Sequence, residues 1–253
     1  MTPKIAITGA NGFIGRILLD SLLSRGWKVQ ALSRSRPPGL DERGVRWISG
    51  DLMDSDSNSL TTLLDGVDVV IHCAGELHDK SVMWELHVEG TKRLIAVARG
   101  RVGHWVQLSS CGVYGPVRSG IVTEASPFNP VGMYEESKLQ AEKIVVDAMN
   151  DGDFSATILR PSNIYGETMT NQSLRVWISV VERGQFFYVG RRGAMTNYVH
   201  VQDVSRALCE CATSERAKGR VYNLSNGCPI EFFVSAMCAC LECDAPRIRL
   251  PET

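Results

Sequence analysis

Apolar residues in this chain occur in short runs separated by longer segments with helical spacing. The first run, residues 4–8, predicts a buried strand, and similar runs predict strands at residues 28–33, 45–49, 67–71, 104–109 and 156–159. Apolar positions every three or four residues predict helices between them, including residues 83–99 and 134–150. Strands that alternate with helices predict an α/β fold with a Rossmann-type, doubly wound parallel sheet.

The regular alternation of predicted strands and helices ends after residue 165, where glycine-rich turns and shorter apolar runs begin. We therefore predict a Rossmann domain over residues 1–165, to which a strand and helix at about residues 195–225 return. Residues 166–253 are expected to form a smaller lobe that mainly binds substrate.

Composition narrows the classes of partner. The formal net charge is −1, so no overall field would attract nucleic acid or an anionic membrane. No apolar run approaches the roughly 20 residues of a membrane span, and the N-terminus lacks a signal-peptide layout. We expect a cytoplasmic protein that acts on a small molecule.

Four of the eight cysteines lie near the C-terminus. Cys238, Cys240 and Cys243 fall in a segment with helical character, where their thiols would point in different directions. We therefore predict no metal site and interpret the cysteines as small apolar residues in a reducing compartment.

A glycine-rich turn joins the first predicted strand to the first predicted helix. Gly9 would permit a sharp turn, Gly12 would let the backbone approach a pyrophosphate, and Gly15 would let the helix pack on the strand. Free N–H groups and the positive end of a helix dipole converge at such a turn. The predicted dinucleotide site comprises Gly9, Asn11, Gly12, Phe13, Ile14 and Gly15.

The ends of later strands extend this site. Ser33 and Arg34 stand where NAD-selective sites carry an acidic residue, and a hydroxyl with a guanidinium would bind a 2′-phosphate. This pair predicts NADP(H), with NAD(H) as the alternative. Further cofactor residues are expected after the third and fourth strands: Asp51, Leu52, Cys73, Ala74 and Gly75.

Tyr134 and Lys138 are four residues apart and therefore lie side by side on a helix. An adjacent ammonium would stabilise a phenolate and lower the pKa of the tyrosine. Such a pair can exchange a proton with an alcohol while hydride passes to or from a nicotinamide. Ser110, at the end of a central strand, would orient the carbonyl.

With these motifs the chain resembles the extended short-chain dehydrogenases/reductases, in the NAD(P)-dependent epimerase/dehydratase group. The matching segments are residues 8–15, 51–52, 87–91, 109–115, 134–138, 160–166, 198–204 and 222–227. The resemblance implies seven parallel strands, catalysis by Ser110, Tyr134 and Lys138, and usually a nucleotide-sugar substrate. It also implies that Lys138 holds the nicotinamide ribose, that Pro161 lies at the cofactor, and that Asn163 lies by the substrate.

The chain departs from that family pattern at two sites. His87 replaces an asparagine that buttresses the active site, and it is either a hydrogen-bonded helix histidine or a proton relay. Residues 196–197 replace an arginine that often clamps a diphosphate; Arg175, Arg191 or Arg192 would substitute, and Arg175 is our substrate-binding candidate.

A third departure concerns reaction type. Cys111 and Gly112 follow Ser110 where dehydratases of the group carry carboxylates, and Cys111 is either a base or a packed thiol. Hydride transfer needs only Ser110, Tyr134 and Lys138. We therefore predict oxidation–reduction at one carbon, as net reduction or as transient oxidation with inversion, and no dehydration.

The predicted function is an NAD(P)-dependent sugar-nucleotide epimerase or ketoreductase. The alternatives are an NADPH-dependent reductase of a small non-sugar ketone or aldehyde, and a cofactor-binding sensor without turnover. The resemblance also implies a homodimer formed through the helices at residues 83–99 and 134–150. The chain stops at Thr253, earlier than family members usually do, so we expect a shortened chain or a reduced lobe.

Overall fold

The structure is a computed structural model that describes residues 2–35, 44–169 and 173–251. These residues form two compact units. The first unit contains residues 1–162 and 201–224, and the second contains residues 163–200 and 225–253. The chain therefore leaves the first unit at residue 163, returns at residue 201, and leaves again at residue 225.

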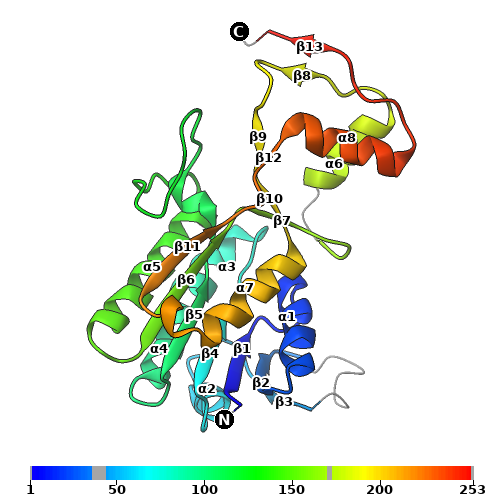
Figure 1. The fold of residues 1–253 in the computed structure, drawn as a ribbon. Coiled ribbons are helices and arrows are strands. Elements are labelled where there is room, and N and C mark those ends of the chain that lie inside the picture. Colours follow the sequence, from blue (N-terminus) through cyan, green and yellow to red (C-terminus); the bar gives the residue numbers. More distant parts are fainter. Residues whose placement is uncertain (1, 36–43, 170–172, 252–253) are drawn as a thin grey trace. The chain divides into compact units, whose positions relative to one another are not determined.

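Seven parallel strands form the sheet of the first unit, in the order β11-β6-β5-β4-β1-β2-β3 (Figure 1). The strands are β1 (Lys4–Thr8), β2 (Lys28–Ser33), β3 (Val45–Ser49), β4 (Val69–His72), β5 (His104–Leu108), β6 (Ser155–Pro161) and β11 (Arg220–Leu224). The order reverses between β1 and β4, because the chain continues from β1 to β2 and β3 and, in the opposite direction, from β4 to β5 and β6. The prediction of a doubly wound parallel sheet of seven strands is confirmed.

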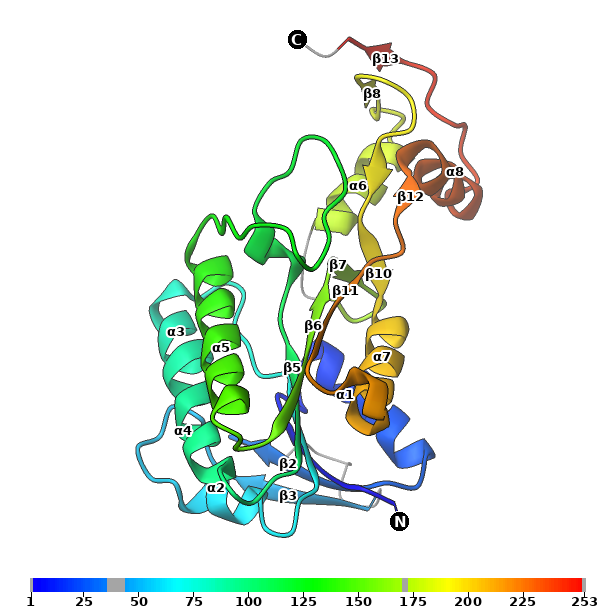
Figure 2. The same ribbon diagram turned by 60° about the vertical axis from the view of Figure 1, so that its left-hand side comes forward.

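Helices cover both faces of this sheet (Figures 1 and 2). One face carries α1 (Phe13–Ser24) and α7 (Val201–Thr213), which pack on each other. The other face carries α2 (Asn58–Leu63), α3 (Lys80–Trp84), a π-helical turn (Glu85–Glu89), α4 (Gly90–Ala98) and α5 (Met133–Asn150). Two short 3₁₀ turns, Cys111–Tyr114 and Glu215–Ala217, complete the unit.

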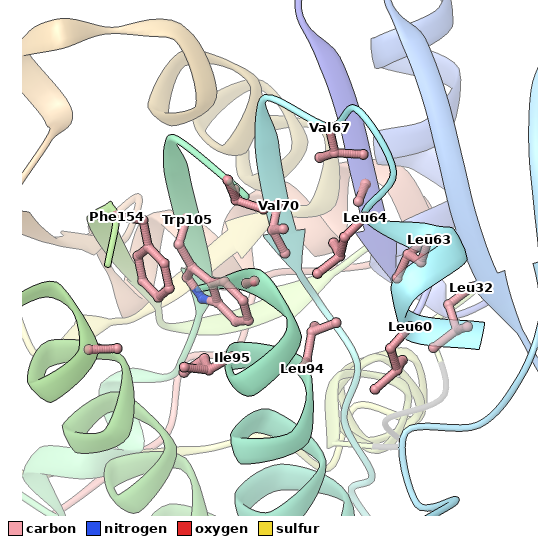
Figure 3. Packing of buried hydrophobic residues seen from close by; sticks show 14 of the residues in the cluster. Leu32, Leu60, Leu63, Leu64, Val67, Val70, Leu94, Ile95, Trp105 and Phe154 are labelled. Carbon is pink, nitrogen blue, oxygen red and sulfur yellow. The ribbon is translucent and has the colours of Figure 1, made fainter. Parts of the chain in front are cut away.

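One hydrophobic core of the first unit lies between the sheet and the α2–α5 face (Figure 3). Trp105 of β5 stacks on Phe154 with ring centroids 5.4 Å apart. Its indole Nε1–H donates to Gln107 Oε1 at 2.9 Å, so this buried polar atom is satisfied. Leucines of α2 and α4 complete the packing: Leu60, Leu63, Leu64 and Leu94. This continuous core fixes the strand ends that carry the site.

The second unit is built from short elements. Its helices are α6 (Ser173–Glu182) and α8 (Ile230–Leu241). Its strands form three pairs: β7 (Asn163–Tyr165) with β10 (Tyr198–His200), β9 (Met195–Thr196) with β12 (Cys228–Pro229), and β8 (Tyr188–Val189) with β13 (Arg249–Leu250). Tyr198 stacks on Phe233 at 5.1 Å, and Tyr165 and Trp177 meet the same ring edge-on.

Two expectations need correction. The predicted helix over residues 83–99 begins at Lys80 and changes to a π-helical turn at Glu85–Glu89. In that turn the backbone hydrogen bonds join residues five apart instead of four. The fourth strand begins at Val69 rather than at residue 67, since Val67 N–H donates to Leu64 O in the preceding turn. In the described part of the chain, no helix is both long and apolar enough to cross a membrane.

Candidate active site

The turn after β1 has room for glycine alone at two positions. Gly9 has a φ of +72°, and a Cβ there would lie 2.7 Å from Ala74 N. A Cβ at Gly15 would lie 2.0 Å from Gly9 O. Gly12 N–H donates to that same oxygen at 3.0 Å and closes the turn. The first helix therefore starts against the strand, with its N-terminal N–H groups at the sheet edge.

A cavity of about 260 Å³ lies at this edge, where the carboxyl ends of β1 and β4 diverge. Nine of the predicted cofactor residues line it: Gly9, Asn11, Gly12, Ser33, Arg34, Asp51, Leu52, Ala74 and Gly75. Sequence reasoning missed six others: Thr8, Ala10, Leu32, Ser35, Gly50 and Leu86. Five of these directly adjoin assigned residues in the sequence, whereas Leu86 is brought in by the π-helical turn.

The other predicted cofactor residues do not line this cavity. Phe13, Ile14 and Gly15 form the first turn of α1, and Cys73 directly follows β4. Pro161 ends β6, next to β11 in the sheet. Tyr134 and Lys138 lie on α5.

The residues present fit a dinucleotide. The glycine turn is a cradle that side chains would fill, and free helix N–H groups face it. Asn11 Oδ1 is buried and finds no donor in the part of the chain that the structure describes. A buried acceptor without a donor is costly, so a ligand hydroxyl or amino group at this point would be favourable.

The loop after β2 is organised by Ser33. Its hydroxyl donates to Ser35 O and accepts from Asn11 Nδ2 and, at 3.3 Å, from Ser35 N–H. This hydroxyl is therefore engaged within the loop, and Arg34 remains exposed. Arg34 is the only basic residue among the described residues that line the cavity.

Ser110, Tyr134 and Lys138 converge beside this cavity. Ser110 follows β5, its Oγ accepts from Gly112 N–H at 3.0 Å, and its side chain lies near that of Tyr134. Lys138 is 5% exposed, and its Nζ donates to Leu108 O at 3.3 Å. Lys138 Nζ lies 5.9 Å from the centre of the Tyr134 ring.

The expectation that Lys138 lowers the pKa of Tyr134 is wrong for this structure. Burial and the charge of Glu135 raise the pKa of Tyr134 to about 12, and the hydrogen bond from Ser110 offsets this only in part. Burial also lowers the pKa of Lys138 to about 8. Desolvation thus sets the direction of both pKa shifts.

His87 lies on the π-helical turn and joins three parts of the site. Glu76 N–H donates to its Nε2 at 2.8 Å, so Nε2 is the acceptor and Nδ1 carries the proton. Nδ1–H donates to Ser137 Oγ at 2.8 Å, and Ser137 Oγ–H donates to Tyr134 O at 2.9 Å. Burial, with the nearby charge of Lys138, lowers the pKa of His87 to about 2. His87 is therefore a neutral, hydrogen-bonded helix histidine that positions the first turn of α5.

A second buried histidine continues this network. Thr8 Oγ1 contacts His72 Nδ1 at 2.6 Å, and His72 Nε2 contacts Thr91 Oγ1 at 3.0 Å. Thr91 Oγ1–H donates to His87 O at 2.5 Å, so His72 Nε2–H donates to Thr91 and Nδ1 accepts from Thr8. Burial lowers the pKa of His72 to about 3. Neutral histidines thus tie the end of β1 to the helix turn beside Tyr134.

Cys111 is a protonated thiol packed under the loop. Its Sγ–H donates to Arg160 O at 3.0 Å, and burial raises its pKa to about 11. Arg160 in turn pairs with Glu142 in the interior. Of the two interpretations of Cys111, the packed thiol agrees with these contacts.

The predicted substrate residues Asn163 and Arg175 belong to the second unit. Asn163 is exposed on β7, and its N–H donates to Asn197 O at 3.1 Å. Arg175 is exposed on α6. In the described residues no group of three or more histidine, cysteine or acidic side chains is placed to hold a metal ion.

Known proteins resemble this chain in sequence. A ketoreductase of 4-hydroxy-2-methyl-3-oxo-4-farnesyl-3,4-dihydroquinoline-1-oxide from Stigmatella aurantiaca is 30% identical over 89% of this chain and 69% of its own length. A dTDP-6-deoxy-L-talose 4-dehydrogenase (NAD(P)(+)) from Kitasatospora kifunensis is 34% identical over 68% of this chain and 55% of its own length. The first curated relatives are matched over 55% to 74% of their length, so the chain spans only part of them.

The fold has solved counterparts as well. The structure of MoeE5 in complex with UDP-glucose and NAD superposes with a TM-score of 0.76 at 26% identity, over 98% of this chain and 88% of that one. The NAD dependent epimerase/dehydratase family matches residues 5–225. The chain therefore belongs to this family, whose members are NAD-dependent oxidoreductases and epimerases of the extended short-chain dehydrogenase/reductase type.

Proposed function

We propose that the chain transfers hydride between NADP(H) and a secondary alcohol or carbonyl carbon, with Tyr134 as the proton donor and acceptor. The observation that carries this proposal is that Ser110 and Tyr134 lie close together beside the buried ammonium of Lys138. A protonated tyrosine is suited to donating to a developing alkoxide. This direction corresponds to carbonyl reduction at neutral pH.

Each residue of the set has a distinct task. Gly112 N–H donates to Ser110 Oγ, which leaves the proton of Ser110 free to be donated in turn. Ser110 would orient the carbonyl oxygen, and Tyr134 would deliver the proton to it. Lys138 would hold the nicotinamide ribose and favour the phenolate that remains.

The glycine turn and the strand ends after it would hold the cofactor, which supplies or accepts the hydride when bound. NAD is bound by MoeE5. We infer a preference for NADP(H) in this chain because Arg34 is the basic residue at the end of β2, where selectivity is set. A 2′-phosphate would gain a charge-assisted bond that the ribose hydroxyl lacks.

The substrate of the first candidate function is a nucleotide sugar, which would be epimerised or reduced. UDP-glucose is bound by MoeE5, and the 34% identical relative acts on a dTDP-deoxysugar. In this reading the second unit is the substrate lobe, and Asn163 and Arg175 bind substrate.

A second candidate function is the reduction of a non-sugar ketone. The second unit contains a cavity of about 500 Å³ whose described lining carries no charged side chain. Its wall is aromatic and aliphatic: Tyr165, Tyr198, Phe233, Leu174, Ile178 and Met237. Such a cavity suits an apolar group better than a diphosphate, and the Stigmatella relative reduces a farnesylated quinoline.

One experiment separates these candidates. NADPH oxidation is measured with dTDP- and UDP-linked 4-ketohexoses and with ketones that carry alkyl, prenyl or aryl groups. Turnover of the nucleotide sugars supports the first candidate, and turnover of the apolar ketones alone supports the second. A protein that binds NADPH but neither oxidises it with any of these ketones nor epimerises a dTDP- or UDP-hexose would be the sensor without turnover.

We also propose that the protein acts in the cytoplasm as a homodimer, through α4 and α5. These helices pack together on one sheet face. A sedimentation experiment that shows a single monomeric species would contradict the proposed homodimer.

A further inference from the structure

Glu135 is the neighbour of Tyr134 in the first turn of α5. Its side chain is half-buried, yet its carboxylate has no hydrogen bond or ion pair with any residue that the structure describes. The charge of Glu135 also contributes to the raised pKa of Tyr134. A carboxylate without a partner beside the proton donor of the site is available for chemistry.

The carboxylate occupies space left by a glycine. A Cβ at Gly112 would lie 2.9 Å from Glu135 Cγ, 3.6 Å from Glu135 Oε1 and 3.2 Å from Ser110 Oγ. The side chain of Glu135 and the hydroxyl of Ser110 therefore border the same point. Position 112 itself supplies no side chain, and α5 brings an acidic group to this point from a different part of the chain.

We propose that Glu135 is a second proton-transfer group, which removes and returns the hydrogen on the carbon next to the substrate carbonyl. This proposal rests on the proposed hydride transfer, because it requires a carbonyl held by Ser110 and Tyr134. Hydrogen-bond donors at the carbonyl oxygen stabilise the enolate that forms when the neighbouring carbon loses its proton. A carboxylate at the same point can accept that proton.

The step balances without a further reactant. The neighbouring C–H bond breaks, its electron pair forms the C=C bond of the enolate, and the proton passes to Glu135. Return of a proton to the same carbon restores the ketone, with retained or inverted configuration. The protein would therefore exchange this hydrogen with solvent and would epimerise the carbon wherever the opposite face is accessible.

Loss of water does not follow from this arrangement. Elimination also needs an acid that protonates the departing hydroxyl. The thiol of Cys111 is committed to Arg160 O, and Gly112 carries no side chain. Positions 111 and 112 thus supply no acid for the departing hydroxyl, and the proposed role of Glu135 is proton exchange alone.

A simpler role for Glu135 is to stabilise the N-terminus of α5, where acidic residues interact favourably with the helix dipole. Glu136 shares that first turn and is exposed. Glu136→Gln is therefore a matched control, since it removes the same charge from the same helix turn. A difference between the two variants reports on the site and not on the helix.

The test measures deuterium uptake from D₂O next to the carbonyl of two probes, a dTDP-linked 4-keto-6-deoxyhexose and 2-methylcyclohexanone. We expect the unmodified protein to accelerate uptake in at least one probe. Glu135→Gln should lower this rate by about a hundredfold, whereas Glu136→Gln should change it by less than about threefold. Uptake in Glu135→Gln equal to that of the unmodified protein, or no uptake above buffer, would overturn the proposal. If the unmodified protein takes up deuterium but oxidises no NADPH, the proposed hydride transfer is contradicted instead.

Discussion

Two neutral histidines in the interior predict that the folded protein loses stability as pH falls below about 6.5. His72 and His87 are each at most 2% exposed, and burial holds their pKa values at about 3 and about 2. Both accept a proton in the unfolded chain near pH 6.5 but not in the folded protein. A group whose folded pKa is lowered contributes stability above its unfolded pKa, and this contribution is lost on acidification.

The size of the effect follows from these values. Between pH 7.5 and pH 5, protonation of one histidine in the unfolded chain alone lowers the free energy of unfolding by about 2 kcal/mol. The two histidines together therefore cost about 4 kcal/mol, a large share of the roughly 5–15 kcal/mol that stabilises a typical protein. Burial also lowers the pKa of His104, which acts in the same direction.

Urea unfolding at pH 7.5 and pH 5 measures this loss. In His87→Asn one of the two groups no longer titrates, so the loss between the two pH values should shrink by about 2 kcal/mol. The comparison uses the difference between pH values within each protein, which removes any constant cost of the substitution. If the unmodified protein and His87→Asn lose the same stability within about 0.5 kcal/mol, His87 does not remain neutral as the structure requires.

Three further outcomes are expected. Arg34→Ala should weaken NADP(H) binding by roughly ten- to a hundredfold, the value of one charge-assisted contact, and should leave NAD(H) binding nearly unchanged. Titration of the protein with each cofactor measures both affinities. Equal affinity of the unmodified protein for NADP(H) and NAD(H) would refute the preference. Ser137→Ala breaks the link from His87 to Tyr134 O and should lower kcat by about tenfold, whereas Ser24→Ala, which removes a comparable hydroxyl-to-carbonyl bond on α1, should not. Incubation with dTDP- or UDP-hexoses should yield no product that has lost water by mass spectrometry, since Cys111 and Gly112 provide no acid for the departing hydroxyl; a Tyr134-dependent loss of water would contradict this.

The order of strands and the glycine turn could be predicted from the sequence, because both depend on local patterns. Buried parallel strands contain continuous apolar runs, as in residues 5–7 and 69–71, and their alternation with helices allows few topologies. The turn at Gly9 and Gly15 is equally local, because a strand, three spaced glycines and an amphipathic helix follow one another directly.

The electrostatics of the site could not be predicted in the same way. The spacing of Tyr134 and Lys138 indicates that they are neighbours but not that both are desolvated, and desolvation decides their pKa values. The place of Glu135 beside Gly112 depends on the packing of α5 on the loop after β5, which are separated by about 20 residues of sequence. Long-range packing of this kind leaves no periodic signal in a single sequence.

The π-helical turn was missed for a related reason. Residues 83–99 have helical spacing throughout, and one extra residue in a turn does not disturb that pattern. The interior bonds of His87 and Thr91 stabilise the wider turn. Their partners come from β4, from the loop after it and from α5, so the helix geometry is set by the assembled unit.

Single-turnover oxidation of NADPH by Tyr134→Phe measures whether Tyr134 exchanges the proton during hydride transfer. The substrate is the ketone that the unmodified protein reduces fastest, and NADPH binding is titrated in parallel. The account predicts that Tyr134→Phe binds NADPH within about threefold of the unmodified protein and oxidises it at least about a hundredfold more slowly. A Tyr134→Phe variant that binds NADPH and retains most of the single-turnover rate would contradict it.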